Sequence, residues 1–253
     1  MKSAKVRSFF NAAGLALVLA VNYLANALPL NGKTTGQLSD QYNVLYTPAG
    51  YVFSIWGLIY TLLSVWVIYQ LFPKNCDKPV FRRIGYWFVL NCLFNSAWIF
   101  AWHYEQVGLS LLIMFGLLST LIVIYKKITE TKETSAFIRI PFSIYIGWVS
   151  VATIVNTGVF LVSHNWNGWG LSHVTWTVIM LIVGTVLAFY FTSKNKDIFY
   201  SLVFVWAFIG IAIKRAELQD IWLSALLVAG VLAIHVIYRL LFNKTTSYNQ
   251  RTQ

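Results

Sequence analysis

The chain has 253 residues, of which 58% are hydrophobic and 11% charged, and 19 Lys and Arg residues against 8 Asp and Glu give a formal net charge of +11. Soluble domains carry roughly 25% charged residues, so this composition excludes an ordinary water-soluble globule. The basic residues lie in short segments between apolar runs and form no single stripe. We therefore expect no nucleic-acid partner.

Eight apolar runs are long enough to cross the roughly 30 Å hydrocarbon core of a bilayer as helices. They are continuous, whereas the strands of a membrane barrel alternate between polar and apolar residues. The predicted spans are 8–28, 51–71, 84–102, 107–125, 138–162, 174–193, 198–213 and 221–242. The sequence thus predicts an all-α polytopic membrane protein with about eight transmembrane helices. The lipid bilayer is therefore one of its expected partners.

The positions of the basic residues predict the orientation of these spans. With eight spans, 16 of the 19 Lys and Arg residues fall on the side of the N-terminus, and only Lys33, Lys214 and Arg215 fall on the other side. Lys and Arg accumulate in cytoplasmic segments. We therefore expect an integral protein of a bacterial plasma membrane with both termini in the cytoplasm.

The N-terminal segment has two interpretations. A basic start, an apolar stretch and Ala25-Asn26-Ala27 are typical of a secretory signal with its cleavage site, and cleavage would leave seven spans. Asn22 and Asn26, however, lie four residues apart on one helix face, as in a retained helix packed against others. Both interpretations leave the orientation of the later spans unchanged.

Three spans each carry a stripe of aromatic and amide side chains on one helical face. The stripes are Phe53, Trp56, Tyr60 and Ser64 in the second span, Asn91, Asn95, Trp98 and Trp102 in the third, and Pro141, Tyr145, Trp148, Ala152 and Asn156 in the fifth. Polar side chains at membrane depth tend to face the interior of a bundle. Plain helix packing and a ligand cavity both explain the stripes, and the small Ala152 beside Trp148 favours a cavity for a flat, largely apolar ligand.

Two segments on the outer side are candidate lids for such a cavity. Residues 31–50 follow the first span, and residues 163–172 follow the fifth. The second segment, with His164-Asn165-Trp166-Asn167-Gly168-Trp169-Gly170, equally fits an ordinary interfacial turn rich in Gly and Trp.

At these residues the sequence resembles the translocator protein family, also called tryptophan-rich sensory proteins or peripheral-type benzodiazepine receptors. The motifs are Tyr46-Thr47-Pro48-Ala49-Gly50-Tyr51-Val52-Phe53-Ser54-Ile55-Trp56-Gly57-Leu58-Ile59-Tyr60, Asn95-Ser96-Ala97-Trp98, and Trp148-Val149-Ser150-Val151-Ala152-Thr153-Ile154-Val155-Asn156. They occur in the family's order on five consecutive spans. The first outer loop lacks the family's Trp and double-Pro block, and Pro141 precedes Trp148 by seven residues instead of four.

The resemblance implies a membrane receptor or sensory protein that binds a tetrapyrrole, such as a porphyrin or haem, or a sterol-like molecule. The implied ligand-binding residues are Trp56, Tyr60, Asn95, Trp98, Trp148, Ala152 and Asn156. It also implies light-dependent porphyrin breakdown at Trp56 and Trp148 as the one candidate enzymatic activity. No catalytic or phosphate-binding motif occurs in the sequence, so we expect no catalytic residue, metal site or required cofactor beyond the tetrapyrrole ligand.

Family members normally have five helices, and the resemblance covers Met1 to Val162. We therefore predict a five-helix bundle in residues 1–163, followed by a three-helix extension and a short cytoplasmic tail in residues 164–253. Ala225, Ala229 and Ala233 repeat at four-residue intervals in the last span. Such a stripe allows close helix packing, either on the first five helices or in a homodimer.

Two further functions remain open at this stage. The added helices fit the transport or export of a small hydrophobic solute, and a scaffold without a ligand is the third reading. Proton-coupled transporters commonly place carboxylates or a histidine relay at membrane depth. Here all eight acidic residues lie in loops or at span ends, which favours a ligand-binding protein over a pump.

Overall fold

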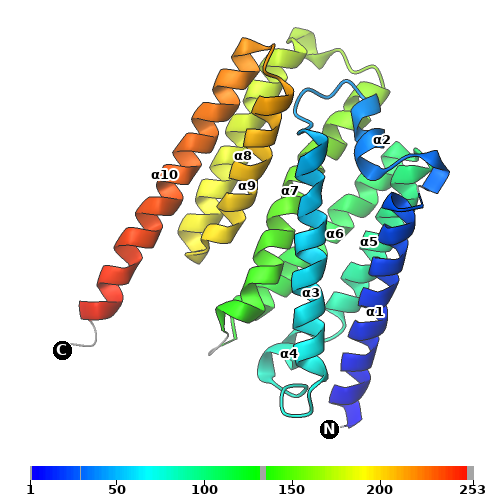
Figure 1. The fold of residues 1–253 in the computed structure, drawn as a ribbon, viewed down its shortest axis with the longest axis vertical. Coiled ribbons are helices and arrows are strands. Elements are labelled where there is room, and N and C mark those ends of the chain that lie inside the picture. The colour runs from blue at the N-terminus through cyan, green and yellow to red at the C-terminus, as the bar shows by residue number, and fades with distance from the viewer. Residues whose placement is uncertain (1, 29, 132–134, 250–253) are drawn as a thin grey trace. The chain divides into compact units, whose positions relative to one another are not determined.

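The computed structural model describes residues 2–28, 30–131 and 135–249, and within these residues it is helical throughout, with no β-strand (Figure 1). The helices are α1 Lys2–Asn26, η1 Leu30–Gly32, α2 Thr35–Gln41, η2 Gly50–Ser54, α3 Ile55–Leu71, α4 Pro79–Ile84, α5 Trp87–His103, α6 Val107–Thr129, α7 Ala136–Ser163, η3 Gly168–Gly170, α8 His173–Asn195, α9 Ile198–Lys214 and α10 Gln219–Asn249. Each predicted span coincides with one of the eight long helices.

The helices differ from the predicted spans at several ends: α10 continues to Asn249, beyond the predicted end at 242, and two helices start later than predicted. The second span was predicted from Tyr51, but the chain forms the 3₁₀ helix η2 first and α3 begins at Ile55. The third span was predicted from Ile84, but Ile84 ends the short helix α4 and α5 begins at Trp87. Gly85 lies between these two helices with a φ of 59°, a backbone conformation that residues other than glycine disfavour.

Among the described residues, six helices are long and apolar enough to cross a membrane: Ser3–Asn26, Gly50–Leu71, Val107–Thr129, Ala136–Ser163, His173–Asn195 and Gln219–Phe242. The other two predicted spans correspond to α5 and α9, with 17 residues each, or about 26 Å at 1.5 Å per residue. The prediction of an all-α polytopic membrane protein is confirmed. The exact number of crossings and the orientation stay predictions.

The chain forms two compact units. Unit 1 contains residues 1–44 and 53–166, and unit 2 contains residues 45–52 and 167–253. Residues 45–52 cluster with the last three helices and not with the first five, and the predicted division between residues 163 and 164 stays a prediction. Whether residues 1–163 fold without the remainder stays a prediction.

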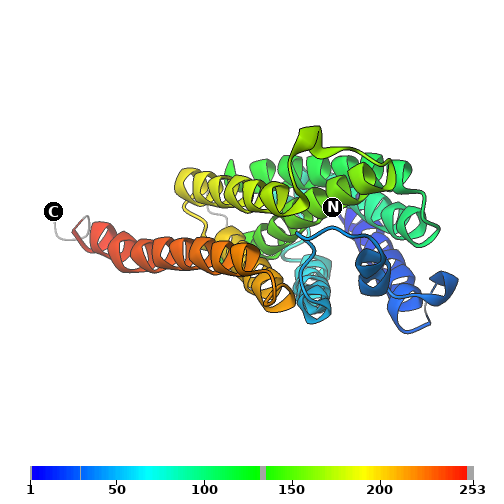
Figure 2. The ribbon, with the colours of Figure 1, turned by 90° about the horizontal axis from the view of Figure 1, so that it is seen from above.

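Unit 1 is a ring of five long helices. α1 packs against α5, α5 against α6, α6 against α7, α7 against α3, and α3 returns to α1. The start of α1 and the turn with α4 lie at one end of this ring, and η1 and α2 lie at the other, the end from which Figure 2 is viewed. We call these the N-terminal end and the α2 end. The ring brings the three predicted stripes, on α3, α5 and α7, into one bundle.

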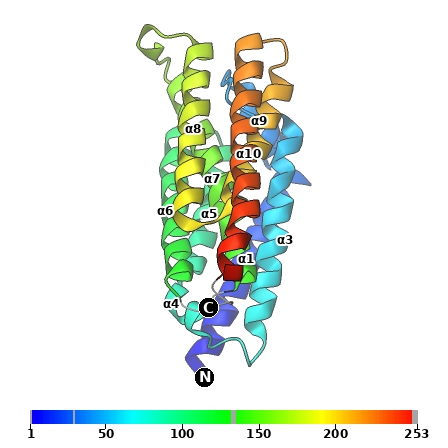
Figure 3. The same cartoon turned by 90° about the vertical axis from the view of Figure 1, so that its left-hand side faces the viewer.

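Unit 2 consists of α8, α9 and α10, which pack against one another side by side (Figure 3), together with residues 45–52. α9 holds this segment by hydrogen bonds to its backbone. Gly210 O accepts from Ala49 N at 3.1 Å, and Trp206 Nε1 donates to Val52 O at 3.1 Å. Lys214 Nζ donates to Pro48 O at 3.3 Å and Arg215 Nε to Leu45 O at 3.2 Å.

Gly210 is the position that permits this close approach. A Cβ atom at residue 210 would overlap the side chain of Val52 and lie 3.3 Å from Pro48 Cβ. The backbone hydrogen bond between Ala49 and Gly210 therefore depends on the absence of a side chain at residue 210.

We predict that Gly210→Ala destabilises unit 2 by about 1–3 kcal/mol, the usual cost of an added methyl group in a close-packed site. The measurement is the thermal unfolding midpoint of the purified protein in detergent. Gly230→Ala in α10 is the control, because nothing beyond the adjoining backbone of its own helix lies within 4 Å of the Cβ position there. An unchanged midpoint for Gly210→Ala would show that the segment is not held as closely as the structure indicates.

Candidate functional site

Trp56 of α3 lies at the centre of a cluster of aromatic rings from α3, α5 and α7. Its ring stacks on Tyr60 with centroids 5.4 Å apart and lies 6.2 Å from both Trp98 and Trp148. Tyr145 lies 5.9 Å from Trp56 in an edge-on contact. Offset and edge-on arrangements at these distances are the favourable geometries of aromatic pairs. We call Trp56, Tyr60, Trp98, Tyr145 and Trp148 the aromatic cluster.

Asn95 of α5 is the polar centre of the same region. Its Nδ2 donates to Tyr145 OH at 2.7 Å, with a longer contact to Tyr60 OH at 3.4 Å. Its Oδ1 accepts from Asn22 Nδ2 of α1 at 3.1 Å. Asn95 has no exposed surface. One amide thus joins α1, α3, α5 and α7 where hydrocarbon offers no alternative hydrogen-bond partner.

Two indole N–H groups of the cluster have no acceptor. Trp98 Nε1 and Trp148 Nε1 are both buried without a hydrogen-bond partner in the part of the chain that the structure describes. Burying an unpaired donor costs about 1–3 kcal/mol, and most buried polar atoms in folded proteins avoid this cost. The cluster therefore combines apolar faces with two donors that are available to an acceptor on a ligand.

Not all predicted site residues lie in this cluster. Trp56, Tyr60, Asn95, Trp98 and Trp148 come together. Asn156 instead exchanges hydrogen bonds with Ser110 of α6, with Asn156 Nδ2 3.2 Å from Ser110 Oγ. Ala152 is half-buried and lies one helical turn from Trp148.

Three residues outside the predicted set belong to the aromatic cluster, contact it or contact Asn95. Tyr145 is on the predicted stripe of α7 but was not included among the ligand-binding residues. Phe53, on the stripe of α3, packs edge-on against Trp148 with centroids 5.7 Å apart. Asn22 entered the prediction only as support for a retained first helix. A polar side chain inside an apolar run also indicates a contact in the bundle interior, and in the structure Asn22 donates a hydrogen bond to Asn95.

The aromatic cluster continues towards the α2 end of unit 1. Trp98 stacks on Trp102 with centroids 5.8 Å apart, and Trp102 Nε1 donates to Thr35 O of α2 at 3.3 Å. A Cβ atom at Gly36 would lie 3.8 Å from the ring of Phe53. The segment predicted as a lid thus contains a helix, α2, that packs on residues adjoining the cluster.

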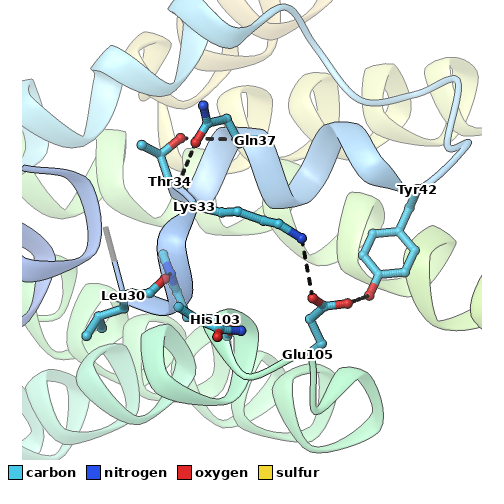
Figure 4. A network of polar contacts seen from close by, with 8 residues as sticks. Leu30, Lys33, Thr34, Gln37, Tyr42, His103 and Glu105 are labelled. Atoms are coloured by element: carbon cyan, nitrogen blue, oxygen red, sulfur yellow. Dashed lines mark hydrogen bonds and ion pairs between the residues drawn. The ribbon is translucent and has the colours of Figure 1, made fainter. Parts of the chain in front are cut away.

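α2 begins with a capping box. Thr34 Oγ1 accepts from Gln37 N at 3.3 Å, and Gln37 Oε1 accepts from Thr34 N at 2.8 Å (Figure 4). This reciprocal pair satisfies backbone groups at the start of a helix that would otherwise lack partners. A seven-residue helix is marginal by itself, so its position depends on the contacts with α5.

His103, the last residue of α5, provides the buried part of these contacts. Its Nδ1 lies 3.1 Å from Leu30 O and its Nε2 lies 3.2 Å from Thr35 Oγ1. A carbonyl oxygen only accepts, so Nδ1 carries the proton, and Nε2 accepts from the Thr35 hydroxyl. Asn31 Nδ2 also donates to His103 O at 3.0 Å. His103 has no exposed surface.

Glu105 provides a second, exposed connection (Figure 4). Lys33 Nζ lies 3.8 Å from Glu105 Oε1, with the two side chains 41% and 44% exposed. Tyr42 OH donates to Glu105 Oε2 at 3.4 Å. Partial burial and the nearby Glu105 carboxylate raise the pKa of Tyr42, so the phenol keeps its proton and remains the donor. Long, exposed contacts of this kind contribute roughly 0–1 kcal/mol.

A comparison with protein families gives a match over most of the chain. The family model described as TSPO-like protein matches residues 8–238. The match extends past Val162, where the motif resemblance ends, through α8 and α9 and into α10. No curated protein and no solved structure matches the chain.

We predict that His103→Leu loosens α2 and that Glu105→Gln does so far less. The first change leaves the Thr35 hydroxyl without its ring partner and leaves the Leu30 carbonyl only the long bond from Lys33 N at 3.4 Å. A loss of about 1.4 kcal/mol or more corresponds to at least a tenfold increase in opening. The second removes only exposed contacts. The measurement is hydrogen–deuterium exchange of residues 34–42, and equal effects of the two variants would contradict the prediction.

Proposed function

Because the chain belongs to the TSPO-like protein family, we propose that this integral membrane protein is a ligand-binding, sensory protein that takes up a tetrapyrrole or a sterol-like molecule. The observation that carries the proposal is the aromatic cluster around Trp56. It offers three indole rings and two phenol rings within one five-helix bundle.

The chemistry of the cluster suits a flat, mostly apolar ligand with a few polar atoms. Indole and phenol faces bind such rings through apolar burial and through contacts that contribute about 0.5–1.5 kcal/mol per aromatic pair beyond the buried area. The unpartnered N–H groups of Trp98 and Trp148 would donate to a carboxylate, carbonyl or hydroxyl oxygen of the ligand. Pockets with apolar walls and a few placed polar groups are typical of small-molecule sites.

The edge of the cluster beside Ala152 is the proposed place of contact. Trp148 itself is 2% exposed, and the rings around it pack against one another. Ala152, one turn along α7, is small and half-buried. In this proposal the ligand lies against Trp148 and Trp56 on that side, while Asn95 holds Tyr60 and Tyr145 in place and Asn156 supports the packing of α7 on α6.

We predict that Trp148→Leu weakens binding of protoporphyrin IX roughly tenfold, equivalent to about 1.4 kcal/mol. The measurement is an absorbance titration of the purified protein in detergent, with cholesterol as a competitor. Trp66→Leu is the matched control. Trp66 is fully buried, its Nε1 also lacks a partner, and it packs in a separate cluster with Phe81, Phe88 and Phe142. Its loss should therefore cost stability without a comparable loss of affinity.

The result separates the candidate functions. Equal affinity in Trp148→Leu and the unaltered protein would remove the cluster from the ligand site. If proteoliposomes then accumulate a hydrophobic solute against its gradient under an imposed pH difference, the transporter hypothesis replaces the receptor hypothesis. If protoporphyrin IX and cholesterol both fail to bind the folded protein, the scaffold reading gains support.

The proposed orientation has the N-terminus and the C-terminus in the cytoplasm, because 16 of the 19 basic residues then lie on that side. We predict that topology reporters inserted after Lys78 and Lys196 read cytoplasmic and that reporters after Gly36 and Gly168 read external. A reporter after Lys196 that reads external, with the other three as expected, would contradict the eight-span arrangement.

A further inference from the structure

Arg7 is a buried cation that has no counter-ion among the residues that the structure describes. It lies in α1 at the N-terminal end of unit 1, directly before the predicted apolar span, and is only 7% exposed. Its Nη2 donates to Cys76 O at 2.7 Å, and its Nε is buried without a partner. The ion pairs among the described residues join Lys33, Arg82 and Lys126 to carboxylates, and none of them involves Arg7.

Next to Arg7, two buried amides leave further polar atoms unpaired. Asn11 lies one helical turn from Arg7 and donates from Nδ2 to Gln70 Oε1 of α3 at 2.8 Å. Neither side chain is exposed. Gln70 Nε2 and Asn11 Oδ1 have no partner. Flipping both side-chain amides would only exchange which donor and which acceptor remain unpaired. One unpaired donor and one unpaired acceptor therefore remain whichever way the amide oxygen and nitrogen atoms are assigned.

The unpaired atoms belong to facing parts of two packed helices. Arg7 and Asn11 are four residues apart on α1 and therefore share a face. Gln70 lies opposite Asn11 through their hydrogen bond, and Ser8 Oγ lies 3.5 Å from Gln70 O. The carbonyl that Arg7 contacts, Cys76 O, belongs to the turn that follows α3. Two donors, Arg7 Nε and Gln70 Nε2, and one acceptor, Asn11 Oδ1, thus lie at one junction of α1 with α3.

The charge around this junction is positive. Lys5 lies on the same helix, and Lys74, Lys78 and Arg82 lie in or next to the turn that contains Cys76. The one carboxylate in that turn, Asp77, lies 3.9 Å from Arg82 Nε and does not pair with Arg7. A buried guanidinium is costly unless an anion or several acceptors satisfy it. Water satisfies hydrogen bonds but leaves the charge uncompensated.

We infer that Arg7 and Gln70 bind a phosphate group at the N-terminal end of unit 1. A guanidinium binds phosphate oxygens with more than one N–H, and the Gln70 amide adds a neutral donor. The unpaired Asn11 Oδ1 suits a hydroxyl, either of a hydrogen phosphate or of the headgroup that carries the phosphate. Arg7 lies where the polypeptide enters its apolar span, and this is the depth at which lipid phosphates are concentrated.

This second site is separate from the aromatic cluster. Between them on α3, Trp66 is enclosed by Phe81, Phe88 and Phe142. The inference about this second site is therefore independent of the proposed tetrapyrrole or sterol ligand.

The phosphate has two sources, an anionic phospholipid of the adjacent leaflet or a soluble phosphate, and the experiment has one arm for each. The full-length protein is placed in phosphatidylcholine nanodiscs and titrated with inorganic phosphate by calorimetry, with sodium chloride as the reference salt. In the second arm, retention of phosphatidylglycerol is measured by native mass spectrometry. We expect saturable binding in at least one arm, and the arm that responds identifies the source.

Arg7→Met should weaken that binding at least tenfold, because it keeps the side chain's length but removes its charge and donors. Lys5→Met is the matched control. It removes the same charge two residues away on the same helix, from an exposed side chain, and should change binding less than twofold. Equal losses in both variants would mean general attraction of anions to a basic surface and would overturn the site.

Two further outcomes are decisive without Arg7→Met. If the folded, unaltered protein binds neither inorganic phosphate nor phosphatidylglycerol saturably, the junction holds only water and the inference is wrong. If Arg7→Met does not accumulate in membranes, Gln70→Met tests the same site, because it removes the second donor and leaves the guanidinium. Binding that is unchanged in Gln70→Met would remove Gln70 from the site and overturn the inference as stated.

Discussion

The structure of unit 1 depends on one constraint, namely that polar atoms inside a bilayer must find their partners within the protein. Asn95 shows how the constraint fixes the arrangement of helices. Its two amide atoms are used by Asn22, Tyr60 and Tyr145, so α1, α3 and α7 are all positioned relative to α5. The rings of Trp56, Trp98 and Trp148 then meet because the helices that carry them are already placed.

The same constraint makes its exceptions informative. Asn91 and Asn156 are satisfied by hydroxyl groups of α6, with Thr120 Oγ1 2.9 Å from Asn91 Nδ2 and Ser110 Oγ 3.2 Å from Asn156 Nδ2. Trp98, Trp148 and Arg7 are not fully satisfied. They lie in two different places, and each place combines unpaired donors with surroundings suited to one ligand class. Aromatic faces surround the indole N–H groups, and Arg7 contacts a turn that is rich in basic residues.

Residue spacing was sufficient to predict much of the aromatic cluster, but not all of it. Steps of three and four residues correctly assigned Trp56, Trp98 and Trp148 to single helix faces. Helical phase does not tell which neighbouring helix a face meets, so it could not show that Asn156, predicted as a ligand-binding residue, pairs with Ser110 of α6. The helix α2 was treated as part of an outer loop, although Thr34 and Gln37 have the spacing of a capping box. Its seven residues contain one large apolar side chain, Leu38, and so gave no hydrophobic period that would have revealed the helix.

The role of the last three helices could not be predicted from the motifs, because it depends on a contact between segments more than 150 residues apart. Trp206 and Gly210 of α9 bind the backbone of Val52 and Ala49, and the absence of a side chain at Gly210 is visible as a requirement only in the folded chain. The motif that enters the second span is therefore divided. Residues 46–52 belong to unit 2, whereas Phe53, Trp56 and Tyr60 belong to unit 1. A family match that continues to residue 238 agrees with this division, since a segment leading directly into the aromatic cluster is held by α9. The last three helices and residues 45–52 thus form one unit, so the motif that leads into α3 is not confined to the first five helices.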